Sequence, residues 1–304
     1  MPPERLEPLV TPVDEAQEYS ADAPLIFRLA LAWATYAPRG KGAVPRALSR
    51  LAPRIRKFSI RTNRGARLAV DNANFDIYTT IARLGGNWER ENMEACFQVL
   101  RPGDVFYDVG ANAGLISVEV AARRPDVTVF GFEPQPNLAQ CIAHSIHLNH
   151  FDNLTIFQTM LGSSEGTAQL HIPTYAVQAS AITREQGART IDCRLTRLDH
   201  QIELGALPAA NVIKMDAEGA EFEVLRGAER LIRDHQPCIL FESDVNMERF
   251  GYSRRELCDY LRNLADYRFY YTGDRLRRAD PELRDDSATD VLAVPASSGR
   301  LNLS

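Results

Sequence analysis

From residue 104 to residue 295 the chain alternates between short apolar runs and amphipathic stretches of helical length, and this alternation limits the fold more than any other feature. The runs 127–132 (VTVFGF) and 237–241 (PCILF) are almost wholly apolar, as parallel strands covered on both faces are. Such strands alternating with helices predict a doubly wound α/β sheet. We expect its strands at 104–109, 127–132, 154–160, 212–216, 237–242, 267–272 and 290–294.

Helices and two hairpins complete the expected elements. Helices are predicted at 23–37, 75–84, 89–100, 115–123, 136–149, 218–233 and 253–265. An N-terminal hairpin is predicted over 58–71, and an inserted hairpin over 167–172 and 189–195. The expected organisation is an acidic disordered tail (1–22), a helical and hairpin extension (23–94), an α/β domain (95–296) with an insertion at 165–200, and a tail (297–304).

Charge is distributed unevenly along the 304 residues, whose net charge is −5. The segment from Arg39 to Arg67 holds ten Lys or Arg and no Asp or Glu. Two interpretations stay open: the segment pairs with the acidic body of its own protein, or residues 23–67 contact an anionic surface such as a membrane, nucleic acid or glycan. The apolar stretch 23–37 is too short to span a bilayer, which takes about 20 residues.

Five scattered cysteines without a CxxC pair fit a reducing compartment. We therefore expect a cytoplasmic protein, with peripheral contact at the inner membrane face as an open alternative.

The stretch DVFYDVGANAGL (104–115) places small residues directly after the first strand. Ligands of doubly wound sheets lie beyond the carboxyl ends of the strands. Gly110 and Gly114 are expected to allow a sharp turn and a close approach of ligand. The spacing differs from G-x-G-x-x-G, and Asp108 would repel a pyrophosphate but pair with an ammonium. S-adenosylmethionine, which has an ammonium and a sulfonium but no phosphate, fits better than NAD.

Acidic residues follow two further strands. Glu133 ends the second strand, about 20 residues on, where a carboxylate accepts hydrogen bonds from a ribose diol. Lys214 and Asp216 share one face of the fourth strand, where burial would demand partners for both. We expect them to pair with each other, with Glu218 or with ligand, whereas Glu221 is explained by helix capping alone.

These motifs together resemble the FkbM family of S-adenosylmethionine-dependent methyltransferases. The resemblance covers roughly residues 85–295 and rests on DVGANAG (108–114), FEPQP (132–136), TRLD (196–199), IKMDAEGAEFEVLRGA (213–228), ILFES (239–243) and DVLAVP (290–295). It implies a Rossmann-like methyltransferase fold, a seven-stranded sheet with an antiparallel last strand, and methyl transfer to a hydroxyl of a sugar, glycan or secondary metabolite. It also implies cofactor contacts from Asp108, Gly110, Asn112, Gly114, Glu133, Pro134, Leu161 and Gly162.

Methyl transfer to an alcohol needs a group that takes or orients its proton. Asp216 is the first candidate, Glu218 and Glu242 follow, Lys214 could hold Asp216 ionised, and His171 is a further base. A divalent ion at the three carboxylates, or at His144, His147 and His150, is an alternative to the metal-free site that we prefer.

Three alternatives to this function stay open. Two of them concern the activity: methylation of nucleic acid through the basic segment 39–67, and a non-catalytic subunit that binds S-adenosylmethionine. The third concerns assembly: a homodimer formed through residues 23–37.

Overall fold

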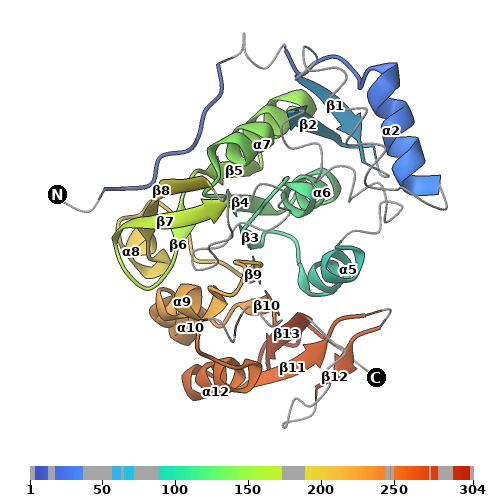
Figure 1. Cartoon of the computed structure of the whole chain (residues 1–304). Coiled ribbons are helices and arrows are strands. Elements are labelled where there is room, and N and C mark those ends of the chain that lie inside the picture. Colours follow the sequence, from blue (N-terminus) through green and yellow to red (C-terminus); the bar gives the residue numbers. More distant parts are fainter. Residues whose placement is uncertain are drawn as a thin grey trace.

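A computed structural model shows a doubly wound α/β fold (Figure 1). It describes residues 4–12, 18–36, 57–62, 65–71, 89–172, 189–243, 247, 250–273, 275–279 and 290–301. The expected helix at 75–84 and the loop 173–187 lie outside these residues.

The central sheet has the strand order β12-β11-β13-β10-β9-β3-β4-β5. Its strands are β3 (Val105–Val109), β4 (Thr128–Phe132), β5 (Leu154–Phe157), β9 (Val212–Met215), β10 (Cys238–Glu242), β11 (Tyr267–Tyr271), β12 (Arg277–Arg278) and β13 (Asp290–Pro295). The block from β10 to β5 is parallel, and β13 lies antiparallel between β10 and β11. The seven expected strands are confirmed, and the two-residue β12 adds an eighth.

Helices cover both faces of this sheet because its strands carry apolar side chains on both faces. They are α2 (Leu25–Tyr36), α5 (Arg90–Val99), α6 (Leu115–Arg123), α7 (Pro136–Asn149), α8 (Leu198–Glu203), α9 (Glu221–Arg226), α10 (Glu229–His235) and α12 (Arg254–Leu264). Helices α5 and α6 cover one face, and α8, α9, α10 and α12 cover the other (Figure 1). The fold thereby leaves the carboxyl ends of β9, β3, β4 and β5 for a site.

The single helix expected over 218–233 is two helices, α9 and α10. Gly227 ends α9, and a Cβ on it would lie 1.9 Å from the carbonyl oxygen of Gly162. A new helix then starts at Glu229, and its first turn is held by Asp199 of α8, whose carboxylate accepts the N–H groups of Arg230 and Leu231 at 2.8 and 2.9 Å. A long-range backbone contact therefore breaks a pattern that is continuous in the sequence.

The N-terminal extension packs into the same core as the sheet. The strands β1 (Lys57–Arg61) and β2 (Arg67–Asp71) form the expected antiparallel hairpin. Phe27 of α2 stacks on Phe58 with ring centroids 4.7 Å apart, and both side chains belong to the cluster that includes Phe106 of β3. The inserted strands β7 (Gly166–Ile172) and β8 (Arg189–Thr196) pair as expected, and join β6 (Met160–Leu161) in a separate sheet.

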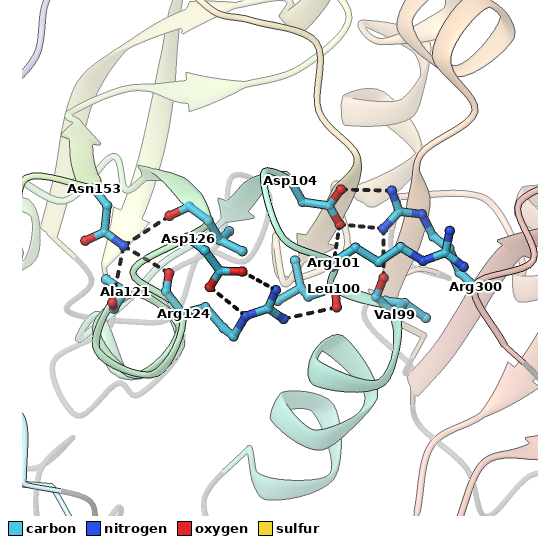
Figure 2. Close-up of polar contacts among 10 residues, drawn as sticks. Val99, Leu100, Arg101, Asp104, Ala121, Arg124, Asp126, Asn153 and Arg300 are labelled. Atoms are coloured by element: carbon cyan, nitrogen blue, oxygen red, sulfur yellow. Dashed lines mark hydrogen bonds and ion pairs between the residues drawn. The ribbon is translucent and has the colours of Figure 1, made fainter.

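Described residues near both ends of the chain make hydrogen bonds to the body of the protein. Near the N-terminus the Leu9 N–H donates to Ile156 O of β5 at 2.9 Å, and the buried Leu6 donates to Gln201 Oε1 at 2.8 Å. Near the C-terminus Arg300 binds Asp104 through both guanidinium nitrogens and also donates to Val99 O at 2.8 Å (Figure 2). Specific hydrogen bonds thus hold the described parts of both segments.

Candidate active site

A pocket of about 670 Å³, counted out to its open mouth, lies at the carboxyl ends of the central strands. Four segments that follow β3, β4, β5 and β9 supply most of its wall. The lining residues are Val109, Gly110, Asn112, Phe132, Glu133, Pro134, Gln135, Thr159, Met160, Leu161, Leu170, Asp216, Ala217, Glu218 and Ala220. This is the position at which doubly wound folds bind ligands.

The turn after β3 adopts the left-handed backbone that its sequence indicates. Gly110 has φ +70° and Asn112 has φ +52°, a region that glycine and asparagine enter most readily. Gly110 lines the pocket, and a Cβ there would lie 1.9 Å from Asp216 O, so the lack of a side chain lets the loops after β3 and β9 approach each other. Gly114 faces Ile142 of α7 and does not line the pocket. Both glycines serve packing of protein against protein.

Glu133 is a buried carboxyl in the pocket wall. Its Oε2 accepts the Asn112 N–H at 2.8 Å, and its Oε1 accepts the Gln135 N–H at 2.9 Å. Burial raises the pKa of Glu133 to about 7, although the N–H groups of Gln135 and Asn112 favour the ionised form. The side chain is fixed by the loops that follow β3 and β4, so its orientation does not depend on ligand.

Asp108, Lys214 and Asp216 form a chain of charges beside the pocket. Lys214 Nζ lies 3.5 Å from Asp108 Oδ1 and 3.6 Å from Asp216 Oδ2, and Ser117 donates to Asp108 Oδ2 at 2.5 Å. Burial alone would lower the pKa of Lys214, but surrounding carboxylates, Asp108 and Asp216 first, hold it above its usual value. Lys214 therefore stays a cation, and Asp216 is the member of this chain that lines the pocket.

Asp108 does not line the pocket, and its side chain has no solvent exposure. It is placed to fix Lys214 from behind the pocket wall, rather than to contact a ligand's ammonium directly.

The loop after β9 is held by groups outside the pocket. Glu218 has φ +53°, which costs a residue with a Cβ about 1–2 kcal/mol. Glu221 accepts the Ala217 N–H at 2.7 Å, and the Tyr252 hydroxyl donates to Gly219 O. Burial raises the pKa of Glu221 to about 7. Glu221 stands in the first turn of α9, as expected, but its carboxyl accepts the N–H groups of Ala217 and Gly219 in place of a helix N–H, and so sets the shape of the loop that presents Asp216.

Glu89 was not anticipated from the sequence. It begins α5 with φ +55°, and Asn92 Nδ2 donates to its Oε2 at 2.6 Å. Burial raises its pKa to about 7; nearby Lys214 lowers it, and Asp216 raises it. Glu89 also lines a second, polar hollow of about 940 Å³ with Asp290 and residues of α5. A carboxyl therefore approaches the Lys214–Asp216 pair from outside the first pocket.

The remaining expected site residues divide into two groups. Pro134 and Leu161 line the pocket, whereas Gly162 does not, and its N–H donates to Thr196 O at 3.0 Å. His171 points to the opposite strand face from the pocket residue Leu170, and its Nδ1 lies 2.9 Å from Thr190 Oγ1. Glu242 ends β10 outside the pocket and contributes to the electrostatic environment of Lys214.

The histidines near the end of α7 are not arranged as metal ligands. Within the described ranges no group of three or more His, Cys, Asp or Glu is arranged to hold an ion. His144 is buried and stacks on Tyr19 with ring centroids 4.1 Å apart. Burial lowers the pKa of His144 to about 4, so its ring is neutral at physiological pH.

Comparison with known proteins gives one family. The family model of the methyltransferase FkbM domain matches residues 108–269, which is more than half of the chain. Methyltransferase 1 of Beauveria bassiana is 24% identical over 194 residues, 57% of this chain and 72% of that protein. Hexuronic acid methyltransferase AglP of Haloferax volcanii is 27% identical over 139 residues, 46% of this chain and 56% of that protein.

Among solved structures, methyltransferase FkbM from Methylobacillus flagellatus KT aligns with a TM-score of 0.42 and 17% identity. The alignment covers 74% of this chain and 55% of that one. The family match includes the turn after β3, Glu133, the Lys214–Asp216 pair and the loop after it. The chain belongs to the FkbM methyltransferase family, and it is a methyltransferase.

Proposed function

We propose that this methyltransferase uses S-adenosylmethionine to methylate a hydroxyl group of a sugar, glycan or secondary metabolite. The charge of the pocket wall carries this proposal. Glu133, Asp216 and Glu218 line the pocket, and its described lining includes no Lys, Arg or His. Such a wall repels the pyrophosphate of a dinucleotide and attracts the ammonium and sulfonium of S-adenosylmethionine.

The spacing of these carboxylates suits an extended ligand. Glu133 follows β4 and Asp216 follows β9, and β3 lies between them in the sheet. Neighbouring strands are about 4.8 Å apart, so the two positions are roughly 10 Å apart across the sheet. Glu133 would hold the ribose diol, and Asp216 would lie toward the methionine end. Met160, Leu161 and Leu170 supply an apolar wall for the adenine beyond Glu133.

Asp216 is our candidate for the group that receives or orients the proton of the acceptor hydroxyl. When bound, the cofactor supplies an electrophilic methyl group on its sulfonium. The Lys214 ammonium, 3.6 Å from Asp216 Oδ2, favours the ionised carboxylate and restricts its position. Asp108 in turn holds Lys214, so the two buried residues act on the acceptor through Asp216. Alignment of the hydroxyl with the methyl carbon then accounts for much of the rate.

A sugar acceptor is supported by one relative. The Haloferax volcanii protein is named as a hexuronic acid methyltransferase, and its match to this chain is 27% identical. A polyhydroxylated acceptor also suits the second hollow, whose described wall consists mainly of carboxyl and amide side chains, one of which, Glu89, interacts electrostatically with Asp216.

Calorimetry with S-adenosylmethionine and S-adenosylhomocysteine tests the proposal. We expect both ligands to bind the wild type, Glu133→Ala to abolish binding, and Asp216→Ala to retain it while losing methyl transfer to sugar alcohols. Glu229→Gln on α10 is the matched surface control and should behave as wild type. Failure of the wild type to bind either ligand would reject the cofactor assignment. Binding without transfer to any hydroxyl acceptor would favour a non-catalytic subunit.

A further inference from the structure

Helix α2 carries an unusual outward face. Among the described residues, the large hydrophobic side chains exposed on the surface are Val10 and three residues of this helix: Leu25 (69% exposed), Leu29 (57%) and Trp33 (46%). The three helical residues are spaced four apart and therefore form one row along the helix. We call this row the α2 stripe.

The opposite face of α2 packs against the body of the protein. Phe27 and Ala30 have no solvent exposure, and Phe27 stacks on Phe58 of the β1–β2 hairpin. Because these contacts fix the rotation of the helix, the α2 stripe points away from the body of the protein. Surface helices of globular proteins normally show the reverse pattern, with polar residues outward.

Positive charge accompanies the α2 stripe. Arg28 is exposed on the same helix, and Arg61 is exposed at the end of β1. In the sequence, Arg39 and Lys41 follow Trp33 by six and eight residues and open the block of ten Lys or Arg without an acid. Leucine, tryptophan and clustered cations are the residues with which interfacial helices bind anionic lipid.

We propose that the α2 stripe inserts into the surface of an anionic bilayer, with the exposed Arg28 and Arg61 toward the lipid headgroups. The contact is peripheral, because no helix in the described ranges is long and apolar enough to cross a membrane. Nucleic acid would engage the cations but gain little from Leu25 and Leu29, since phosphates are contacted by polar and charged groups. A symmetric dimer through α2 would bring two copies of the same basic segment together.

Sedimentation with vesicles tests this inference on the full chain. Wild type should bind phosphatidylcholine vesicles that contain phosphatidylglycerol, bind pure phosphatidylcholine far more weakly, and lose affinity as salt rises. The triple variant Leu25→Gln, Leu29→Gln, Trp33→Gln should lose at least about tenfold in affinity, because its three apolar side chains no longer insert into the bilayer surface. Val10→Gln is the matched control and should bind as wild type.

A second measurement reports insertion directly. In a Trp88→Phe background Trp33 is the remaining tryptophan, and its emission should shift to shorter wavelength with anionic vesicles. The triple variant should keep wild-type circular dichroism and S-adenosylhomocysteine affinity, since its changes are exposed and distant from the pocket.

Equal vesicle binding by wild type and triple variant would overturn the inference. It would equally fail if the wild type bound no vesicle, if RNA or DNA competed fully for the same site, or if the triple variant only converted a dimer to a monomer.

Discussion

Asp108 and Lys214 are direct neighbours across the parallel strands β3 and β9, with Lys214 Nζ 3.5 Å from Asp108 Oδ1. Both side chains are almost fully buried, so each charge is stabilised by the other in place of the water that it loses on burial. The pair connects the motif after the first strand to the motif after the fourth. Two sequence features that look like separate ligand contacts therefore form one electrostatic unit.

The first prediction concerns this unit. Lys214→Met should destabilise the protein by about 3–5 kcal/mol, because it leaves Asp108 as a buried charge beside Asp216. Adding Asp108→Asn to Lys214→Met should recover part of that loss, since the stranded charge is removed. Denaturant unfolding measures both effects. Arg233→Gln, which breaks an exposed pair with Glu229, is the control and should change the unfolding free energy little.

The second prediction concerns Glu133 and pH. Ribose hydroxyls donate to an ionised carboxylate, and the pKa of Glu133 without ligand is about 7. Affinity for S-adenosylhomocysteine should therefore rise with pH, by up to about tenfold per unit below pH 7, and level off above it. Glu133→Gln should bind weakly with little slope. Glu221→Gln removes a carboxyl of similar pKa outside the pocket, and should keep the slope.

The raised pKa of Glu133 also makes the stability of the ligand-free protein depend on pH, in the opposite direction from ligand affinity. The folded state holds the Glu133 proton up to about pH 7, whereas the unfolded chain releases it near 4.5. This contribution to stability is complete below about pH 4.5 and is lost as pH rises toward 7. The wild-type melting temperature should fall over that range, and less so in Glu133→Gln. Identical pH dependence in the two proteins would contradict the buried, protonated state.

The third prediction separates Glu89 from the cofactor pocket. Glu89→Gln should leave affinity for S-adenosylhomocysteine unchanged and lower kcat by roughly 10–100-fold, because a carboxyl beside Lys214 and Asp216 assists proton removal from the acceptor. The rising limb of the pH–rate profile, expected near pH 7 in wild type, should move in the variant. Glu91→Gln, from the same helical turn and hollow, is the control. A purely structural role would change stability without moving the profile.

The fourth prediction isolates steric contact from backbone strain. Gly110 and Gly103 both have positive φ, but a Cβ on Gly110 meets Asp216 O at 1.9 Å, whereas a Cβ on Gly103 meets nothing within 4 Å. Gly103→Ala should cost about 1–2 kcal/mol from φ alone. Gly110→Ala should cost clearly more and weaken S-adenosylhomocysteine binding, because the loops after β3 and β9 must separate. Equal unfolding free energies would show that these loops are not in close contact.

Local sequence patterns predicted most of the fold. The helices at 115–123 and 136–149 have the observed bounds, because Gly114 and Pro136 mark their starts within the sequence itself. The break between α9 and α10 could not be predicted in this way. It depends on the approach of Gly227 to Gly162, which are 65 residues apart in the chain.

The site was predictable where it depends on strand ends. Glu133 and Asp216 directly follow strands of one parallel block, and both line the pocket. Leu170 reaches the pocket from the inserted hairpin, and Glu89 approaches from α5, so no spacing rule indicates either. His171 does not line this pocket, because successive residues on a strand point to opposite faces and Leu170 is the one that faces the pocket.

The segment around Leu9 has a consequence for how the protein behaves at high concentration. Strand β5 is the last of its side of the sheet, and such strands offer unpaired N–H and C=O groups to other chains. The Leu9 N–H donates to Ile156 O, and the Leu9 side chain packs against the apolar cluster that includes Ile156 and Ala139. Removing the first ten residues would expose the edge of β5 to pairing with other chains. The truncated protein should therefore aggregate although its pocket is intact.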